Sequence, residues 1–385
     1  MAELSGKLPK PLEGVRVLEI GGMGPTPFAG MLLADMGAEV LRVERPGGLG
    51  VFPGDARQDL LNRGKQSVAL DLKSPAAVAA VLALVERADI LIEGGRPGVV
   101  ERLGIGPDEC HRRNPPLVYG RMTGWGQDGP LAHTAGHDIG YIAVTGALHA
   151  IGDAGGPPQI PLNLIGDFGG GSTYLVMGVL AALTEARLHG RGRVVDAAIV
   201  DGAAHLMAAI HAFVNTGTWA DERGVNMLDG GAPYYGIYET SDSKHMAVGA
   251  IEPKFYAVLL EGLGLSIEMS EQNDRSTWPQ TRAVIATAFA SRTQRQWTEV
   301  FDGTDACVSP VVSILDAAHH PHMKTRGSVV LENGVVQPAP APRFSGTAPT
   351  IGSPPPQIGE DTEAVLARWG VDPTPLIAGG VAVQS

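Results

Sequence analysis

Cysteine, long apolar runs and positive charge are all scarce in this sequence. Its 385 residues include only Cys110 and Cys307, so it has neither a disulfide framework nor the cysteine spacing of a zinc site. No stretch reaches the roughly 20 apolar residues that a membrane span needs. The start "MAELSGKLPKPLEGV" lacks the apolar core of a signal peptide, and the ending "GGVAVQS" is not a recognised peroxisomal signal. We therefore expect a soluble, cytoplasmic protein.

The charge balance limits the ligands that the chain can attract. Acidic residues number 41 and basic residues 29, which gives a net charge of −12. Such a field argues against general binding to nucleic acid or to a membrane surface. An anionic ligand must therefore be held by local basic groups. The length favours two domains, and an apolar content of 44% is typical of a globular protein.

Apolar runs of strand character alternate with helical segments over the first half of the chain. "GVRVLEI", "AEVLRVERP", "SVALDL", "DILIEG" and "LVYGRMTG" are strand-like, and "SPAAVAAVLALVERA" is a helix with Ser74 as its N-cap and Pro75 next. This order predicts a doubly wound α/β domain with a mainly parallel sheet. A long helix is expected from Asp201 to about Gly217. A hairpin within 234–250, followed by helices, then predicts a small α+β domain at 236–321, and a proline-rich strap returns from it.

The glycine-rich loop "GGMGPTPFAG" follows the first strand and opens a helix. It is similar to a dinucleotide fingerprint, but Pro27 occupies the third glycine position. Pro25 and Pro27 also remove amide donors that a pyrophosphate would need. The sequence therefore disfavours nicotinamide binding and favours a tight structural turn.

Several basic residues lie at or near the ends of predicted strands. They are Arg45, Lys65, Lys73, Arg96 and Arg102. Any one of them alone is consistent with a solvated surface charge. Because open α/β sheets bind ligands at the carboxyl ends of their strands, the group together favours a phosphate-bearing ligand.

Three titratable positions stand beside glycine or at predicted helix starts. His137 is consistent with an ordinary loop histidine, and Glu252 with a plain helix cap. Asp167 differs, because Gly169, Gly170 and Gly171 follow it and have no capping purpose. We expect a helix to begin after these glycines, at about Ser172, with its bare amides facing a developing negative charge and Asp167 beside them as a base.

Long motifs in a fixed order resemble those of the alpha-methylacyl-CoA racemases, within the family III CoA-transferase superfamily. The resemblance runs nearly end to end and is carried by "LADMGAEVLRVERPG", "LIEGGRPGVVERLGIGP", "TGWGQDGP", "AGHDI", "PLNLIGDFGGGS", "GRGRVVDAAIVDG" and "NMLDGGAPYY…VGAIEPKFY". One departure is Gly140, where such racemases usually carry asparagine.

The resemblance implies an architecture. It predicts a large Rossmann-like domain over 1–198 that is completed by 341–385, a helical linker at 199–235, the small domain at 236–321 and a return linker at 322–340. It also predicts a homodimer of interlocked chains, with an active site between the large domain of one subunit and the small domain of the other.

The resemblance also implies roles for individual residues. His137 and Asp167 match the two bases on opposite faces of the substrate's α-carbon, and Glu252 matches the carboxylate that orients the histidine. The residues matched to contacts with the CoA thioester are Arg45, Lys73, Arg96, Arg102, Asp138, Tyr141 and Asn163. We expect Gly169 and Gly170 to offer backbone donors to the enolate oxygen. No metal or separate cofactor is expected, because CoA is part of the substrate.

Two other functions remain open at this point. A family III CoA-transferase would use Asp167 as a covalent nucleophile, although the transferases lack the histidine that matches His137. A non-catalytic acyl-CoA-binding protein is disfavoured by the presence of His137, Asp167 and Glu252 together. The acyl group cannot be read from the sequence.

Overall fold

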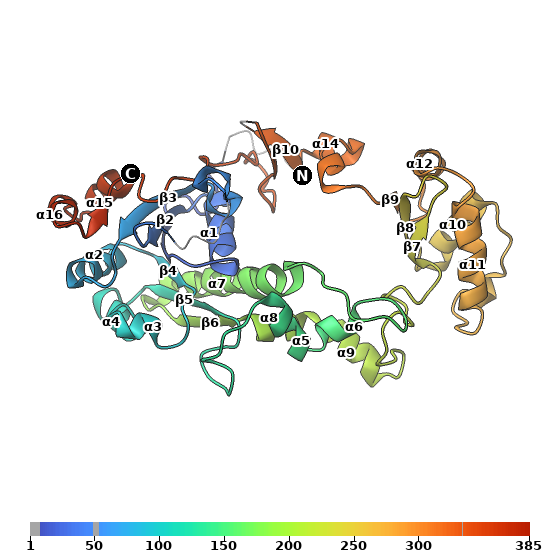
Figure 1. The fold of residues 1–385 in the computed structure, drawn as a ribbon, viewed down its shortest axis with the longest axis horizontal. Helices are drawn as coiled ribbons and strands as arrows, with labels where there is room; N and C mark the ends of the chain where they lie inside the picture. Colours follow the sequence, from blue (N-terminus) through green and yellow to red (C-terminus); the bar gives the residue numbers. More distant parts are fainter. Residues whose placement is uncertain (1–7, 49–53, 333) are drawn as a thin grey trace. The chain divides into compact units, whose positions relative to one another are not determined.

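The computed structural model describes residues 8–48, 54–332 and 334–385, which form two compact units (Figure 1). Unit 1 comprises 8–145, 162–206 and 322–385, and unit 2 comprises 146–161 and 207–321. These units differ from the domains expected from the sequence. Residues 146–161 belong to unit 2 and not to the large domain, and the expected linker residues 199–206 and 322–340 belong to unit 1. The Arg223 guanidinium helps to hold 146–161 in unit 2, since it donates to the carbonyls of His149 and Gly156, each at 2.8 Å.

Unit 1 is built on a seven-stranded sheet with the order β12-β3-β2-β1-β4-β5-β6. The strands are β1 (Arg16–Ile20), β2 (Glu39–Glu44), β3 (Lys65–Leu70), β4 (Ile90–Glu93), β5 (Val118–Thr123), β6 (Val194–Ala198) and β12 (Ala382–Val383). Strands β1 to β6 are parallel, while β12 pairs antiparallel with β3 at the edge. The predicted α/β class with a mainly parallel sheet is confirmed.

Helices cover both faces of this sheet and create two hydrophobic cores. Neighbouring residues of a strand face opposite sides, and accordingly Leu18 belongs to one core and Val17 to the other. The first core is covered by α2 (Pro75–Val85), α4 (Pro107–Arg113), α15 (Thr362–Arg368) and α16 (Thr374–Ala378). The second is covered by α1 (Pro25–Asp35) and α7 (Thr173–His189). Helix α2 begins as predicted, with the Ser74 side chain accepting from the amide of Ala76.

Shorter elements complete unit 1. They are the 3-10 turns η1 (Ala56–Gln58) and η2 (Leu60–Asn62), the helices α3 (Val99–Arg102), α5 (Asp138–Val144) and α8 (Ile199–Leu206), and the hairpin β10 (Val329–Glu332) with β11 (Val335–Pro338). The long helix expected from Asp201 to Gly217 is broken at Met207. Its two parts, α8 and α9, fall in different units.

The helix that carries the glycines starts earlier than expected. Leu164–Ser172 form a π-helix, η3, which continues directly into α7 and ends where Gly190 adopts a φ of 70°. The expected start at about Ser172 is therefore wrong. The combined helix of residues 164–189 also has the length and composition of a membrane span, because an 18-residue window within it has a mean hydropathy of 1.2. No such span was expected from the sequence. Core helices of folded domains pass the same test, and Leu175 and Val179 are fully buried in unit 1.

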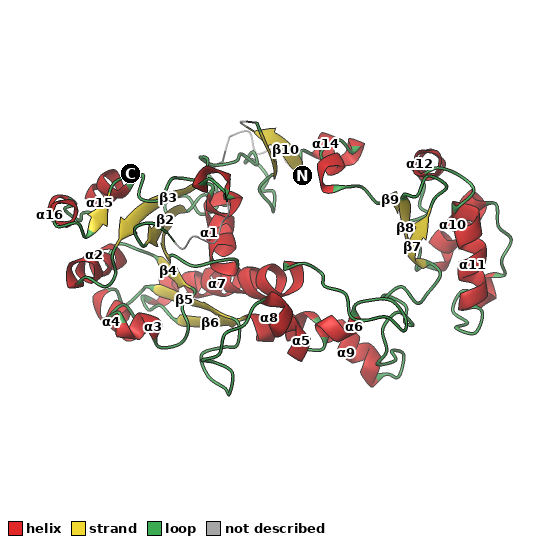
Figure 2. Cartoon of the chain, in the orientation of Figure 1, coloured by secondary structure: helices red, strands yellow, loops and turns green. Residues whose placement is uncertain are grey.

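Unit 2 contains a three-stranded antiparallel sheet with helices packed around an aromatic core (Figure 2). The strands are β7 (Tyr235–Glu239), β8 (His245–Gly249) and β9 (Val308–Pro310), and β7 with β8 forms the predicted hairpin. The other elements are α6 (Ala147–Ala150), α9 (Ala208–Asn215), α10 (Pro253–Leu263), η4 (Met269–Glu271), α11 (Trp278–Phe289), α12 (Gln294–Phe301) and α13 (Ile314–Ala317), with α14 (Pro321–Arg326) at the boundary of the two units.

Candidate active site

A cavity of about 270 Å³ opens at the carboxyl ends of the central strands of unit 1. Its walls include the segments that follow β1 (Met23–Thr26), β4 (Gly94–Pro97) and β5 (Gly124, Trp125). Strand order runs outward from β1 in one direction and from β4 in the other, so the cavity lies at the topological switch point of the sheet. Open α/β sheets bind their ligands there.

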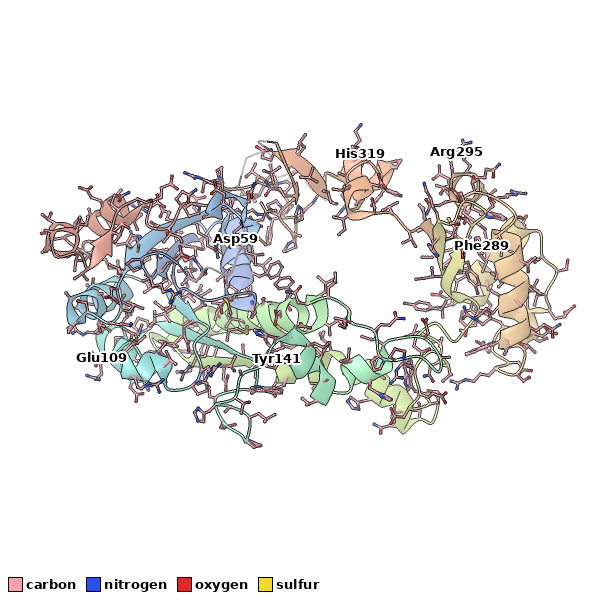
Figure 3. The ribbon with its side chains drawn as sticks, in the orientation of Figure 1. Asp59, Glu109, Tyr141, Phe289, Arg295 and His319 are labelled. Carbon is pink, nitrogen blue, oxygen red and sulfur yellow. The ribbon has the colours of Figure 1, made fainter. Side chains whose placement is uncertain are left out.

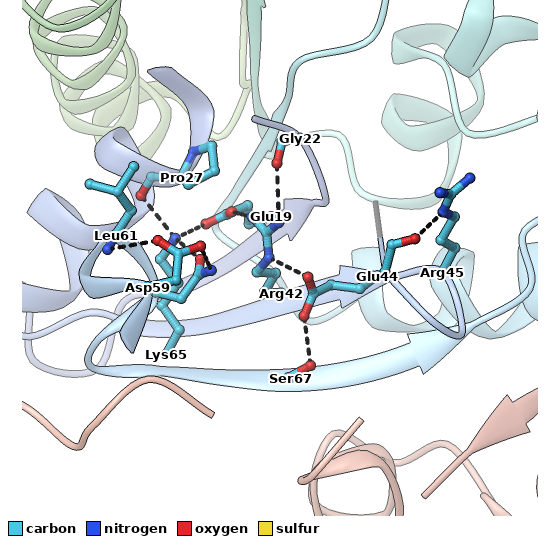
Figure 4. A network of polar contacts seen from close by, with 12 residues as sticks. Glu19, Gly22, Pro27, Arg42, Glu44, Arg45, Asp59, Leu61, Lys65 and Ser67 are labelled. Carbon is cyan, nitrogen blue, oxygen red and sulfur yellow. Dashed lines mark hydrogen bonds and ion pairs between the residues drawn. The ribbon is translucent and has the colours of Figure 1, made fainter. Parts of the chain in front are cut away.

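The loop after β1 is held by a buried network of charges (Figure 4). The Lys65 ammonium pairs with Glu19 at 2.8 Å and donates to the carbonyl of Pro27 at 2.8 Å. Arg42 pairs with the same Glu19 and donates to the carbonyl of Gly22 at 3.1 Å. Burial lowers the pKa of Lys65 to about 8, and the charge of Glu19 opposes that change. Lys65 is therefore a structural cation, and its expected contribution to a phosphate site is wrong.

Asp167 projects toward this loop from the π-helix η3. Gly24, at the N-cap of α1, has a φ of 59°, and a side chain there would lie 3.3 Å from Asp167 Oδ2. Glycine is thus required both by the backbone and by the neighbouring carboxylate. Burial raises the pKa of Asp167; the Asn163 amide, which donates to Oδ2 at 3.4 Å, opposes this rise, and the charge of Asp138 adds to it. A carboxylate with a raised pKa is a stronger base than an ordinary aspartate, which suits it to removing a proton from carbon.

His137 lies in the same cavity wall as Asp167. It is an exposed residue at the N-cap of α5. Tyr141, which also lines the cavity, follows one helical turn later (Figure 3). The Tyr141 ring packs edge-on against Trp125 with centroids 4.8 Å apart. Burial and the charge of Asp167 raise the pKa of Tyr141, so its hydroxyl stays protonated. The structure therefore places both predicted bases, His137 and Asp167, in one cavity together with Tyr141, a predicted contact residue.

The three glycines after Asp167 serve helix packing and do not face the cavity. A side-chain carbon at Gly170 would lie 2.6 Å from the backbone nitrogen of Ala203 in α8, and one at Gly171 would lie 3.0 Å from Ile199. At Gly169 the nearest atom would be the carbonyl oxygen of Leu164, at 2.9 Å. The packing against α8 explains the absence of side chains, and neither Gly169 nor Gly170 lines the cavity, so their predicted oxyanion role stays a prediction. They allow two helices to approach at backbone distance.

The residues expected to contact CoA are distributed over several loops of unit 1. Arg96 lines the cavity. Arg45, Lys73 and Arg102 are exposed near the ends of β2, β3 and α3, and they do not line it. Arg45 donates to the carbonyl of Gly48. Their proposed contacts with phosphate therefore remain predictions.

Two further predicted site residues contact Asp167, and a third belongs to unit 2. Asn163 is the N-cap of η3, and its amide reaches the Asp167 carboxylate. Asp138 is buried and accepts the backbone N–H of Asp167 at 2.7 Å. Glu252 is the exposed N-cap of α10, and its side chain makes no capping hydrogen bond.

Part of the cavity wall consists of residues for which the sequence predicted no site role. The pattern "GGMGPTPFAG" predicted a structural turn only, and no role was predicted for Trp125. The loop does form a tight turn, but Met23–Thr26 also line the cavity. Its place directly after a strand of an α/β sheet was the available signal. Trp125 Nε1 is buried without a hydrogen-bond partner in residues 8–48, 54–332 and 334–385, a feature that sequence alone could not reveal.

Comparison with known proteins adds independent information. Residues 12–362 match the model of CoA-transferase family III. Mouse and human proteins named alpha-methylacyl-CoA racemase are each 45% identical to this chain, over 93% of both sequences. The Mycobacterium tuberculosis protein Rv3272, named a probable fatty acyl-CoA transferase, is 31% identical over 93% of this chain and 98% of its own. Its crystal structure matches with a TM-score of 0.76 at 29% identity, covering 93% of this chain and 99% of that one.

Proposed function

Because this chain belongs to CoA-transferase family III, we propose that it inverts the α-carbon of 2-methylacyl-CoA thioesters. Two proteins named as racemases of such thioesters share 45% of its residues over nearly the full length. The observation that carries the proposal is that His137 and Asp167, two bases of opposite charge type, line one cavity.

The proposed reaction is a 1,1-proton transfer through an enolate. One base removes the α-proton, the C–H electron pair forms the enolate double bond, and the carbonyl π pair moves to oxygen. The other base, already protonated, returns a proton to the opposite face. The entering thioester therefore meets one unprotonated and one protonated base, and once the α-proton has been removed both His137 and Asp167 carry a proton beside the enolate. Which of the two is unprotonated at the start depends on which enantiomer enters. Each positioned base contributes roughly 10²–10⁴-fold to the rate.

Side chains of the cavity wall can donate a hydrogen bond to the enolate oxygen in addition to the amides predicted from the sequence. Donor side chains in the cavity wall include Thr26, Arg96, Trp125 and Tyr141. The indole N–H of Trp125 has no partner within the part of the chain that the structure describes. The phosphates of CoA would be held by Arg96, together with the exposed basic residues Arg45, Lys73 and Arg102 near the ends of β2, β3 and α3.

Glu252 completes the proposal as a partner for His137 from a second copy of the chain. Accepting the proton of the imidazole nitrogen that faces away from substrate would fix the tautomer and stabilise the imidazolium. This role requires a homodimer, and it rests on the resemblance to the racemases. Its support in the structure is that the Glu252 side chain is exposed and makes no capping hydrogen bond.

Deuterium exchange tests the proposed activity directly. A 2-methylacyl-CoA is incubated with the protein in D₂O without an acceptor acid, and α-deuterium is followed by NMR. We expect incorporation and inversion without added metal, flavin or nicotinamide and after dialysis against EDTA. In His137→Ala and Asp167→Ala, inversion should nearly stop, while each variant still exchanges the α-proton of a different enantiomer. Equal exchange of both enantiomers by both variants would contradict one base per face.

A CoA-transferase is the second candidate, and the 31% identity to a probable fatty acyl-CoA transferase favours considering it. Asp167 would then attack the thioester carbonyl, forming an anhydride and releasing the CoA thiolate. That thiolate would attack the Asp167 carbonyl, which releases the donor acid and leaves a CoA thioester on Asp167, and the CoA would pass from there to a second carboxylate. Such an enzyme would show no turnover until an acceptor acid is added. Tight binding without exchange or transfer would indicate an acyl-CoA-binding protein.

A further inference from the structure

The buried carboxylate of Asp138 is not explained by the proposed reaction. The residue is 7% exposed and does not line the cavity, although its neighbour His137 does. Its Oδ2 atom has no hydrogen-bond partner among the described residues. A carboxylate is costly to bury, so its retention beside two bases calls for a specific contact.

That contact is with the main chain of Asp167. Asp138 Oδ1 accepts the N–H of Asp167 at 2.7 Å. Gly166 leaves room for it, because a side-chain carbon at that position would collide with the same oxygen. The first N–H groups of a helix have no acceptor within the helix. The Asp138 carboxylate therefore provides the acceptor for the Asp167 N–H that η3 itself lacks.

The carbonyl of Asp167 is held from the other side. The Ser172 hydroxyl, fully buried, lies 2.9 Å from that carbonyl oxygen and 2.8 Å from the carbonyl oxygen of Pro25. Stacking of Phe28 on Phe168, with centroids 4.4 Å apart, fixes the same two segments together. Both polar groups of the Asp167 peptide are thus bound by buried side chains.

We propose that Asp138 is a positioning residue, which fixes the carboxylate of Asp167 in the cavity through its backbone, and that it is not a CoA contact. This inference rests on the proposed function, in which Asp167 is a base. It differs from the role that the resemblance implied, because a buried side chain outside the cavity wall would act on substrate only through Asp167.

The charge of Asp138 has a second, measurable effect. The titratable groups that act on Asp167 are Asp138 and His137, and Tyr141 lies close enough to be affected by it in turn. Asp138 adds to the rise that burial causes in the pKa of Asp167. Removing only that charge should lower the pKa of Asp167. Since Asp167 acts as a base when ionised, the acidic limb of the rate profile for its enantiomer should move to lower pH.

Two variants separate the hydrogen bond from the charge. Asp138→Ala removes both, while Asp138→Asn keeps an acceptor oxygen of the same size. We expect kcat for deuterium exchange by Asp167 to fall about 10²-fold in the alanine variant, with KM unchanged, because small displacements of a reacting group have effects of this size. The asparagine variant should recover most of the rate and show the shifted acidic limb. Asp89→Ala is the matched control, because Asp89 also accepts a backbone N–H, that of Arg16 at 2.8 Å, near the opposite ends of the strands.

Hydrogen exchange followed by mass spectrometry tests the contact independently of activity. The peptide that covers residues 163–172 should exchange faster in Asp138→Ala than in the wild type, and at nearly the wild-type rate in Asp138→Asn. Unchanged exchange and kcat in the alanine variant would refute the inference, as would a raised KM with unchanged kcat in both variants. If the wild type incorporates no α-deuterium, the proposed function fails, while the peptide measurement still decides whether Asp138 holds Asp167.

Discussion

Replacing Gly170 by alanine would insert a methyl group between two helices that meet at backbone distance. The new carbon would lie 2.6 Å from Ala203 N, and 3.1 Å from both Ala203 Cα and the carbonyl carbon of Gly202. Ordinary contacts begin near 3.4 Å. Since these neighbours are backbone atoms, η3 and α8 would have to separate by about 0.8 Å, the difference between 3.4 and 2.6 Å. No rotamer change can relieve the contact.

The expected cost follows from two opposing effects. Overpacking of this kind costs about 1–3 kcal/mol, and contact with three backbone atoms places Gly170 at the upper end of that range. Alanine in a helix recovers roughly 0.5–1 kcal/mol relative to glycine. The net loss should be about 2 kcal/mol, which lowers Tm by about 4–8 °C in a domain of 150–250 residues.

Thermal unfolding followed by circular dichroism measures this loss. Gly140→Ala is the control, because Gly140 also lies inside a helix but a side-chain carbon there has nothing within 4 Å. That variant should be as stable as the wild type or up to about 1 kcal/mol more stable. A Gly170→Ala protein with an unchanged or higher Tm would refute the conclusion that the glycines exist to admit α8.

Two further predictions concern the paired subunits and the buried charges. His137→Ala and Glu252→Gln chains with different tags can be co-expressed and purified as a mixed dimer. About half of the wild-type activity should return, because one of the two sites then carries neither change. A mixed dimer without activity would refute the cross-subunit contact. Lys65→Met removes one partner of the fully buried Glu19 and should lower the free energy of unfolding in urea by about 3 kcal/mol. The control Arg295→Ala breaks an exposed ion pair and should lower it by less than about 1 kcal/mol. Equal losses in the two variants would contradict the structural role of Lys65.

The sequence predicted those features that depend on local chemistry. Ser74 and Pro75 marked the start of α2, and the alternation of strands and helices predicted the sheet. The π-helix was missed because a hydrogen bond to the fifth residue leaves no residue pattern of its own. The break at Met207 was missed for a similar reason, since the apolar pattern continues through it.

The candidate site was predicted in part, for reasons that differ between residues. His137, Tyr141 and Asp167 lie in one cavity as the resemblance implied. The glycines were misinterpreted because the need for close approach is visible in a sequence, whereas the approaching partner is not. A ligand and a neighbouring helix require the same absence of a side chain, and only the structure distinguishes α8 from a substrate.

The short strand β12 has a consequence for the way this protein is made. Ala382 and Val383 pair with Leu70 and Ala69, so the edge of β3 is covered by residues that are synthesised long after β3 itself. All of unit 2 is translated between those two strands. Contacts so distant in sequence form slowly, and an uncovered strand edge invites pairing with other chains. On the ribosome, the sheet of unit 1 therefore keeps an open edge at β3 until β12 has been translated, and during this interval that edge is available for pairing with other chains.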